Sequence, residues 1–304
     1  MTHRTSRVNR HRLGTAVLTV AFLLALPPAL AHAQLVRSAA GIGVGNATAA
    51  RDQFRADLGG GVAAGANGSF GGLRREINWD GVPATSSAPN NLAANFFNTN
   101  SPRGAVFSTP GTGFQVSGAA GDAGAGQPAA ANFGNINAQY SSVFNAFSAQ
   151  RLFTPIGSTI TDVTFFLAGT STAGLTSGFG SIFSDVDLAN VSSIQFFDAA
   201  NLSLGSFFVP NFGGATAPHF SFLGVSFAAP IISRVRITTG NAALSAAVLD
   251  QNGDLNDLVV MDDFLYGEVA GTVVPEPATL GMLAFGLVAV AFGARRRAAS
   301  RSMM

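Results

Sequence analysis

The chain contains no cysteine and no lysine among its 304 residues. The absence of cysteine excludes disulfides, thiolate catalysis and zinc–thiolate sites. The absence of lysine excludes a Gly-Lys phosphate-binding loop. A folded domain of this chain must therefore be held together by its apolar core or by a metal ion.

The N-terminus has the three-part pattern of a secretory signal peptide. Several arginines precede an apolar run from Leu13 to Leu26, and Pro27-Pro28 ends that run. Ala31-His32-Ala33 then supplies the small-x-small pattern of a cleavage site. We expect residues 1–33 to be removed after Sec export, so that the mature chain begins at Gln34; an uncleaved anchor is the alternative.

The C-terminus carries a second hydrophobic segment between a proline motif and a group of arginines. Seventeen helical residues rise about 25 Å, the short end of what spans a bilayer. The arginines resist translocation and should stay in the cytoplasm. The prolines keep Glu276 in an extended segment that is open to processing at the outer surface. The predicted sorting segment is residues 270–304, with a motif at 274–279 that begins Val274-Pro275-Glu276-Pro277, a transmembrane helix at 278–294, and Arg295, Arg296 and Arg297.

This tail resembles the PEP-CTERM sorting signal of Gram-negative bacteria, which has the same three parts in the same order. Proteins of that family are substrates of an exosortase, a membrane peptidase-transferase that cuts near the motif. The resemblance implies an inner-membrane-anchored intermediate that is then delivered to the cell envelope or extracellular matrix. A plain C-terminal membrane anchor is the alternative interpretation.

The segment between the two ends is acidic. Residues 34–273 contain nine arginines against fifteen aspartates and glutamates, so the formal net charge of +1 of the whole chain comes from its ends. Nucleic-acid binding needs a basic face, and we therefore expect no nucleic-acid partner.

Helical patterns are scarce in this segment. Ala47–Leu58 is the one good helix candidate, because Phe54 and Leu58 share a face and glycines follow. The flanking Ser38–Thr48 and Gly59–Phe70 are rich in small residues and resemble linkers. Residues 34–70 are therefore predicted to be a flexible segment with a short helix.

From Glu76 onward, short apolar runs alternate with turn residues, which is typical of strands. About ten strands without helical crossovers favour an all-β fold, an antiparallel β-sandwich or jelly roll over residues 71–269. Phenylalanine, with twenty-six residues in the whole chain, should supply most of its core. The predicted strands are 104–108, 113–117, 159–167, 178–183, 192–197, 203–209, 219–225, 231–238, 246–249 and 258–266, with a long loop at 118–135.

Several short sequence motifs of the predicted sandwich region resemble a recurrent ectodomain of PEP-CTERM proteins. They include Arg74-Arg75-Glu76-Ile77-Asn78-Trp79-Asp80-Gly81, Phe183-Ser184-Asp185-Val186-Asp187 and Met261-Asp262-Asp263-Phe264-Leu265-Tyr266-Gly267-Glu268. That group has no assigned activity, so the resemblance supports the fold more than a function.

Oxygen ligands are the positive chemical signal. Residues 250–257 place carboxylate and amide oxygens around Gly253, and calcium prefers six to eight such oxygens. The segment is not an EF-hand, since Leu255 stands where the loop glycine belongs. Adjacent like charges beside apolar strand residues cost stability unless a cation offsets them. We predict a structural Ca²⁺ site drawing on some of Asp185, Asp187, Asp250, Asp254, Asp257, Asp262 and Asp263; an ordinary solvated turn is the alternative.

Other chemistry has weaker support. A Ser-His-Asp site would depend on His219, the only histidine after residue 33, which we interpret as a partly exposed strand residue. Glu76 and Glu268 leave a carboxylate glycoside hydrolase open, but nothing marks them as a pair. Sugar stacking would need Trp79, Tyr140 or Tyr266, and for Trp79 we favour a core position over a binding platform.

We expect a non-enzymatic, exported protein with a structural or adhesive role in exopolysaccharide or biofilm. A calcium-dependent, lectin-like carbohydrate-binding module is the first alternative, and a glycoside hydrolase the second.

Overall fold

The structure is a computed structural model that describes residues 33–60, 64–119, 130–213, 218–250 and 255–271. The two predicted hydrophobic segments, at 13–26 and 278–294, lie outside these residues. Within the described residues, no helix has both the length and the hydropathy needed to cross a bilayer.

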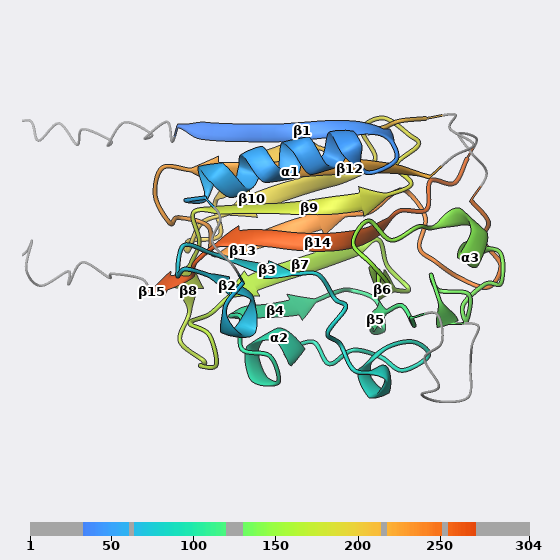
Figure 1. Cartoon of the computed structure of the whole chain (residues 1–304), viewed down its shortest axis with the longest axis horizontal. Helices are drawn as coiled ribbons and strands as arrows, with labels where there is room; N and C mark the ends of the chain where they lie inside the picture. The colour runs from blue at the N-terminus through green and yellow to red at the C-terminus, as the bar shows by residue number, and fades with distance from the viewer. Residues whose placement is uncertain (1–32, 61–63, 120–129, 214–217, 251–254, 272–304) are drawn as a thin grey trace, which may run out of the picture. The chain divides into compact units, whose positions relative to one another are not determined.

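An eight-stranded and a five-stranded antiparallel sheet form the body (Figure 1). The larger sheet has the order β1 (Gln34–Ile42), β12 (His219–Phe227), β9 (Gly178–Ser184), β14 (Val260–Gly267), β3 (Arg74–Ile77) and β2 (Ser69–Phe70), with β6 (Phe153–Ile156) paired to β14 and β5 (Gly113–Val116) to β6. The smaller sheet has the order β11 (Ser203–Phe208), β10 (Ser193–Phe197), β13 (Arg234–Thr238), β7 (Ile160–Phe165) and β4 (Ala105–Ser108). A two-stranded ribbon joins β8 (Gly174–Leu175) and β15 (Ala270–Gly271).

Helices are few in the described residues. Helix α1 (Gly45–Asp57) lies along the outer face of the larger sheet, over β1 and β12 (Figure 1). The shorter α2 (Phe96–Thr99), α3 (Tyr140–Val143) and two 3₁₀ turns (Ala66–Gly68 and Ala84–Ser86) lie in connections. The prediction of an all-β sandwich is confirmed, and so is the helix predicted at residues 47–58.

Burial follows from this layering. Strands β7, β10 and β13 alternate between buried and partly exposed residues, because only one face of the smaller sheet meets the core. Every residue of β9, β12 and β14 is buried, since the smaller sheet packs against one face of these strands and other elements cover the other. The core between the sheets is rich in phenylalanine, as the composition predicted.

Two facing glycines let helix α1 approach the larger sheet. Gly224 of β12 pairs with Gly180 of β9, and the ring of Phe54 lies over both. A Cβ at Gly224 would lie 2.9 Å from ring atoms of Phe54, and a Cβ at Gly180 would lie 3.0 Å from that ring. The glycines therefore make room for the aromatic anchor of the helix.

The N-terminal segment differs from its prediction. Ser38–Thr48 was expected to be a linker, but residues 34–42 form β1, which pairs with all nine residues of β12. The segment has few large apolar side chains, so its local pattern is weak. Pairing with a long, buried neighbour supplies the backbone hydrogen bonds that its own composition does not predict.

The strand predictions were otherwise confirmed for β4, β5, β7 and β9 to β14. Residues 246–249, predicted as a strand, form a turn and irregular backbone instead. Strands β3 and β6 were missed because each is short and carries charged or proline residues among its apolar ones. The predicted loop at 118–135 lies largely outside the described residues.

Candidate metal centre and polar cleft

Three of the side chains that could hold a metal meet where β9 ends and β12 begins. Asp185 and Asp187 directly follow β9, and His219 is the first residue of β12. The two strands are antiparallel neighbours, with Phe220 opposite Ser184, so that the residues just beyond this pair face each other. The backbone N–H of Asp185 donates to the carbonyl of His219 at 3.4 Å.

These three side chains form a tight, buried cluster, here named the Asp-His cluster. The Nε2 atom of His219 lies 3.6 Å from Oδ1 of Asp185 and 3.5 Å from Oδ1 of Asp187. One ligand atom of each residue lies within 4.8 Å of the others. Asp185, Asp187 and His219 are only 8%, 4% and 2% exposed. The interpretation of His219 as partly exposed was therefore wrong, because the loop after β9 covers it.

Two further predicted carboxylates pack around the Asp-His cluster. Asp257 accepts the backbone N–H groups of Asp187 and Leu188, both at 3.2 Å, and so fixes the loop that carries Asp187. Asp250 accepts the N–H of Leu258 at 3.2 Å and lies against Asp185.

Burial and neighbouring negative charges raise the pKa values of the carboxyl groups in and beside the Asp-His cluster. Burial, and then the charges of Asp250 and Asp187, raise the pKa of Asp185 to about 9. Burial also raises the pKa of Asp257 to about 6, while the N–H groups that it accepts act in the opposite direction. Buried carboxylates this close together need protons or a cation to offset their repulsion.

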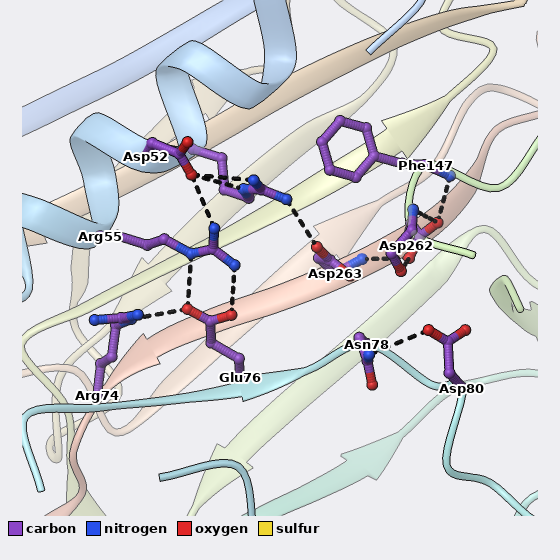
Figure 2. Close-up of polar contacts among 11 residues, drawn as sticks. Asp52, Arg55, Arg74, Glu76, Asn78, Asp80, Phe147, Asp262 and Asp263 are labelled. Carbon is purple, nitrogen blue, oxygen red and sulfur yellow. Dashed lines mark hydrogen bonds and ion pairs between the residues drawn. The ribbon is translucent and has the colours of Figure 1, made fainter. Parts of the chain in front are cut away.

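Asp262 and Asp263 are not part of the Asp-His cluster, and each contacts other protein groups. Asp262 accepts the N–H groups of Phe147 and Ser148, at 2.7 and 3.2 Å, and the hydroxyl of Ser148 at 3.0 Å (Figure 2). Asp263 pairs with Arg51 of α1 at 3.4 Å. The predicted ligands are thus divided: four lie in or beside the Asp-His cluster, Asp262 and Asp263 anchor a loop and a helix, and Asp254 lies outside the described residues.

A second candidate site, here named the polar cleft, opens between α1, the 64–70 connection and the outer face of β3 and β14. Its volume is about 400 Å³. Ion pairs hold its walls: Arg55 makes two bonds to Glu76, at 2.8 and 2.6 Å, and Arg74 makes a third at 2.8 Å (Figure 2). The polar residues that line the cleft are Arg51, Arg55, Asn67, Glu76, Asn78, Arg103, Ser148 and Asp263.

Arg103 differs from the other arginines of the polar cleft. Its side chain also lines a neighbouring pocket of about 360 Å³, and its guanidinium carbon lies 5.1 Å from the centroid of the Phe97 ring. Within the described residues its Nε donates no hydrogen bond, and no aspartate or glutamate forms an ion pair with it. Burial lowers the pKa of Arg103 from its ordinary value, and the charge of Arg75 adds to that effect.

The aromatic residues considered for sugar stacking are all buried. Trp79 is 1% exposed, and both tyrosines, Tyr140 and Tyr266, are fully buried. Each tyrosine hydroxyl donates to a backbone carbonyl, Tyr266 to that of Arg103 and Tyr140 to that of Val248. The preference for a core position of Trp79 is confirmed, and stacking of a sugar on any of these three rings is excluded.

The glutamates considered for hydrolysis are both ion-paired. Glu76 pairs with Arg55 and Arg74, whereas Glu268 pairs with Arg75 at 2.7 Å. They belong to separate ion-pair networks and do not form a carboxylate pair.

Comparison with known families identifies the C-terminal tail. Residues 273–297 match the family model of the PEP-CTERM protein-sorting motif. The matched segment contains the predicted Val274, Pro275, Glu276 and Pro277 and the arginines at 295–297, and it lies outside the described residues. No curated protein matches the chain.

Proposed function

The chain carries a PEP-CTERM sorting signal and is an exosortase-processed, exported protein, and from this premise we propose an adhesive role in the extracellular matrix. The domain would hold exopolysaccharide in the polar cleft, where Arg103 would bind a single anionic substituent of a sugar. Sec export, an inner-membrane-anchored intermediate and a Gram-negative host belong to the same proposal.

Arg103 is the observation that carries the adhesive role. A partly buried guanidinium without an acidic partner is electrostatically costly, and a carboxylate, sulfate or phosphate group on a sugar would offset that cost. Arg103 lines both the polar cleft and the pocket beside it. A ligand in either of them could therefore reach the Arg103 guanidinium.

The rest of the polar cleft supports a binding role. Its other arginines, Arg51 and Arg55, are fixed by ion pairs to Asp263 and Glu76 before any ligand arrives, which lowers the entropic cost of binding. Amide side chains of Asn67 and Asn78 offer donors and acceptors for sugar hydroxyls. With Trp79 and both tyrosines buried, affinity would come from polar contacts and from many copies acting together on one polymer.

Retention on polysaccharide tests this function. The mature protein, recovered from producing cells, is passed over exopolysaccharide from the same cells. We expect the Arg103→Ala variant to lose retention about ten-fold, and the wild-type retention to weaken as salt rises. The matched control is Arg236→Ala, which removes an arginine that pairs with Asp162 on the exposed face of the smaller sheet.

Equal retention of Arg103→Ala and wild type would reject the polar cleft as the binding site. Turnover of the polysaccharide during the experiment would favour the hydrolase hypothesis over simple adhesion.

A further inference from the structure

We propose that Asp185, Asp187 and His219 bind one first-row divalent transition-metal ion, zinc in the first place, and that this ion ties β9 to β12. The site is separate from the polar cleft. It modifies the calcium site predicted from the sequence, because a histidine that the prediction did not include lies at the centre of the cluster.

The spacing of the ligand atoms fits such an ion. In a tetrahedral site with bonds of about 2.0–2.1 Å, neighbouring ligand atoms are about 3.3–3.4 Å apart. The Nε2 of His219 lies 3.6 and 3.5 Å from the two carboxylate oxygens, which is too long for a good hydrogen bond and close to this ligand–ligand distance. The ligand atoms of Asp185 and Asp187 lie within 4.8 Å of each other. A small rotation of these side chains would bring the two oxygens to the ligand–ligand distance of a tetrahedral site.

A second observation at Asp185 also points to a ligand. The other carboxylate oxygen of Asp185, Oδ2, is buried and receives no N–H or O–H donor within the part of the chain that the structure describes, and the Asp185 carboxyl lies instead against the carboxyl of Asp250. The backbone of Asp185 has φ +71°, in the left-handed region that non-glycine residues rarely adopt. Such strain is commonly maintained at functional sites, where it aims a side chain.

The donor set favours a transition metal over calcium. Calcium takes six to eight oxygen ligands, whereas imidazole nitrogen suits zinc and its neighbours in the first row. Two carboxylates and one imidazole complete three positions of a tetrahedron. Asp250 lies against Asp185. It could occupy the fourth coordination position, or it could orient the residues that bind the ion directly.

The place of the cluster in the fold defines what the ion would do. Asp185 and Asp187 follow one strand and His219 starts the next, so that the ion would join two adjacent central strands at one end of the sandwich. In a chain without cysteine, the bound ion would cross-link β9 and β12 as a disulfide could. The free energy of ion binding would add to the stability of the fold.

Metal content and binding test the proposal on the full mature protein. Elemental analysis of protein purified without chelator should find about one equivalent of zinc or manganese. After removal of the ion, titration calorimetry with Zn²⁺, Mn²⁺ and Ca²⁺ should show one site that prefers the transition ions. X-ray absorption of the zinc form should show nitrogen and oxygen ligands, including imidazole, at about 2.0–2.1 Å.

Variants separate a true site from adventitious binding. Asp187→Asn and His219→Gln should each lower zinc affinity at least ten-fold, while the control Asp162→Asn, in an ion pair on the other sheet, should leave it unchanged. Asp185→Asn serves if His219→Gln does not fold, as judged by circular dichroism.

Two results would overturn the proposal: no bound divalent ion, or calcium binding that His219→Gln does not alter. Neither result depends on polysaccharide, so this proposal and the adhesive role of the polar cleft can fail independently.

Discussion

The indole of Trp79 lies flat on the ring of Phe153, with 4.1 Å between the centroids and 1° between the planes. Phe97 and Phe264 meet the same indole edge-on, at 5.4 and 5.0 Å. The only tryptophan of the chain is therefore the centre of an aromatic cluster between the two sheets, where offset and edge-to-face contacts are favourable.

Truncation of Trp79 should destabilise the domain strongly. We expect Trp79→Ala to lower the free energy of unfolding by about 3–5 kcal/mol, because it removes buried apolar surface and leaves a cavity. Urea unfolding followed by circular dichroism measures this loss. Phe208→Ala, at a position 57% exposed, should change stability by less than about 0.5 kcal/mol. Similar losses for the two variants would contradict the core role of Trp79.

The facing glycines under α1 give a second prediction. Gly224→Ala should cost about 1–3 kcal/mol, because the new methyl group would overlap the rings of Phe54 and Phe222. Gly45→Ala is the control, since a Cβ there meets nothing within 4 Å. Combining Gly224→Ala with Phe54→Leu should recover part of the loss, as thermal unfolding would show. An additive double variant would mean that the ring is not the cause.

Asp262 should be replaceable by asparagine more easily than by alanine. Asparagine keeps a carbonyl oxygen that can accept the N–H groups of Phe147 and Ser148, whereas alanine leaves these buried donors without an acceptor. Hydrogen exchange at the two amides should accelerate at least ten-fold in Asp262→Ala and much less in Asp262→Asn. Unchanged exchange in Asp262→Ala would show that other contacts hold the loop.

Asp80 should make stability depend on pH. Burial raises the pKa of Asp80 to about 6 from 3.8, and the charge of Asp263 adds to the effect. The folded state therefore holds a proton that the unfolded state has released between these values, so the free energy of unfolding falls as pH rises from about 4 to 6.

The difference between wild type and Asp80→Asn isolates this contribution. We expect Asp80→Asn to gain about 2–4 °C in melting temperature relative to wild type between pH 4 and 6, after allowance for solvent screening. A constant difference across this range would mean that Asp80 titrates normally.

The sorting signal gives the last prediction. Deletion of residues 273–297 should abolish exosortase processing, and the protein should no longer reach its normal envelope or surface fraction. Fractionation and mass spectrometry of the C-terminus measure both effects. Glu276→Gln keeps the hydrophobic segment and the arginines, and a loss of processing in this variant would separate the motif from a plain membrane anchor.

Much of the sandwich was predictable because its central strands carry long runs of phenylalanine and β-branched residues. Strand β1 was not, since its stability comes from the neighbour β12 and not from its own Ser- and Ala-rich sequence. Strand pairing also explains why only some of the predicted carboxylates lie in or beside the Asp-His cluster. Local sequence shows that Asp185 directly follows a strand and that Asp262 lies within one, but only strand pairing decides which partners they meet.

His219 shows how the Asp-His cluster could have been found. An Asp-x-Asp pattern directly after one apolar strand, together with a histidine at the start of another, becomes a metal-ligand set if the two strands are antiparallel neighbours. That adjacency is a property of the topology. The sequence contains the ligand residues, but it has no local information on which strands pair and so on which ligands meet.

The pairing of β1 with β12 joins the beginning of the described chain to a segment 177 to 193 residues later, and β3 pairs with β14 over a similar separation. Contacts of this kind slow folding, because a long loop must close before they form. The larger sheet cannot be completed until the chain through β14 has been made. Under the proposed Sec export, in which the chain crosses a membrane unfolded, this delay would keep the larger sheet open until the chain reached the far side.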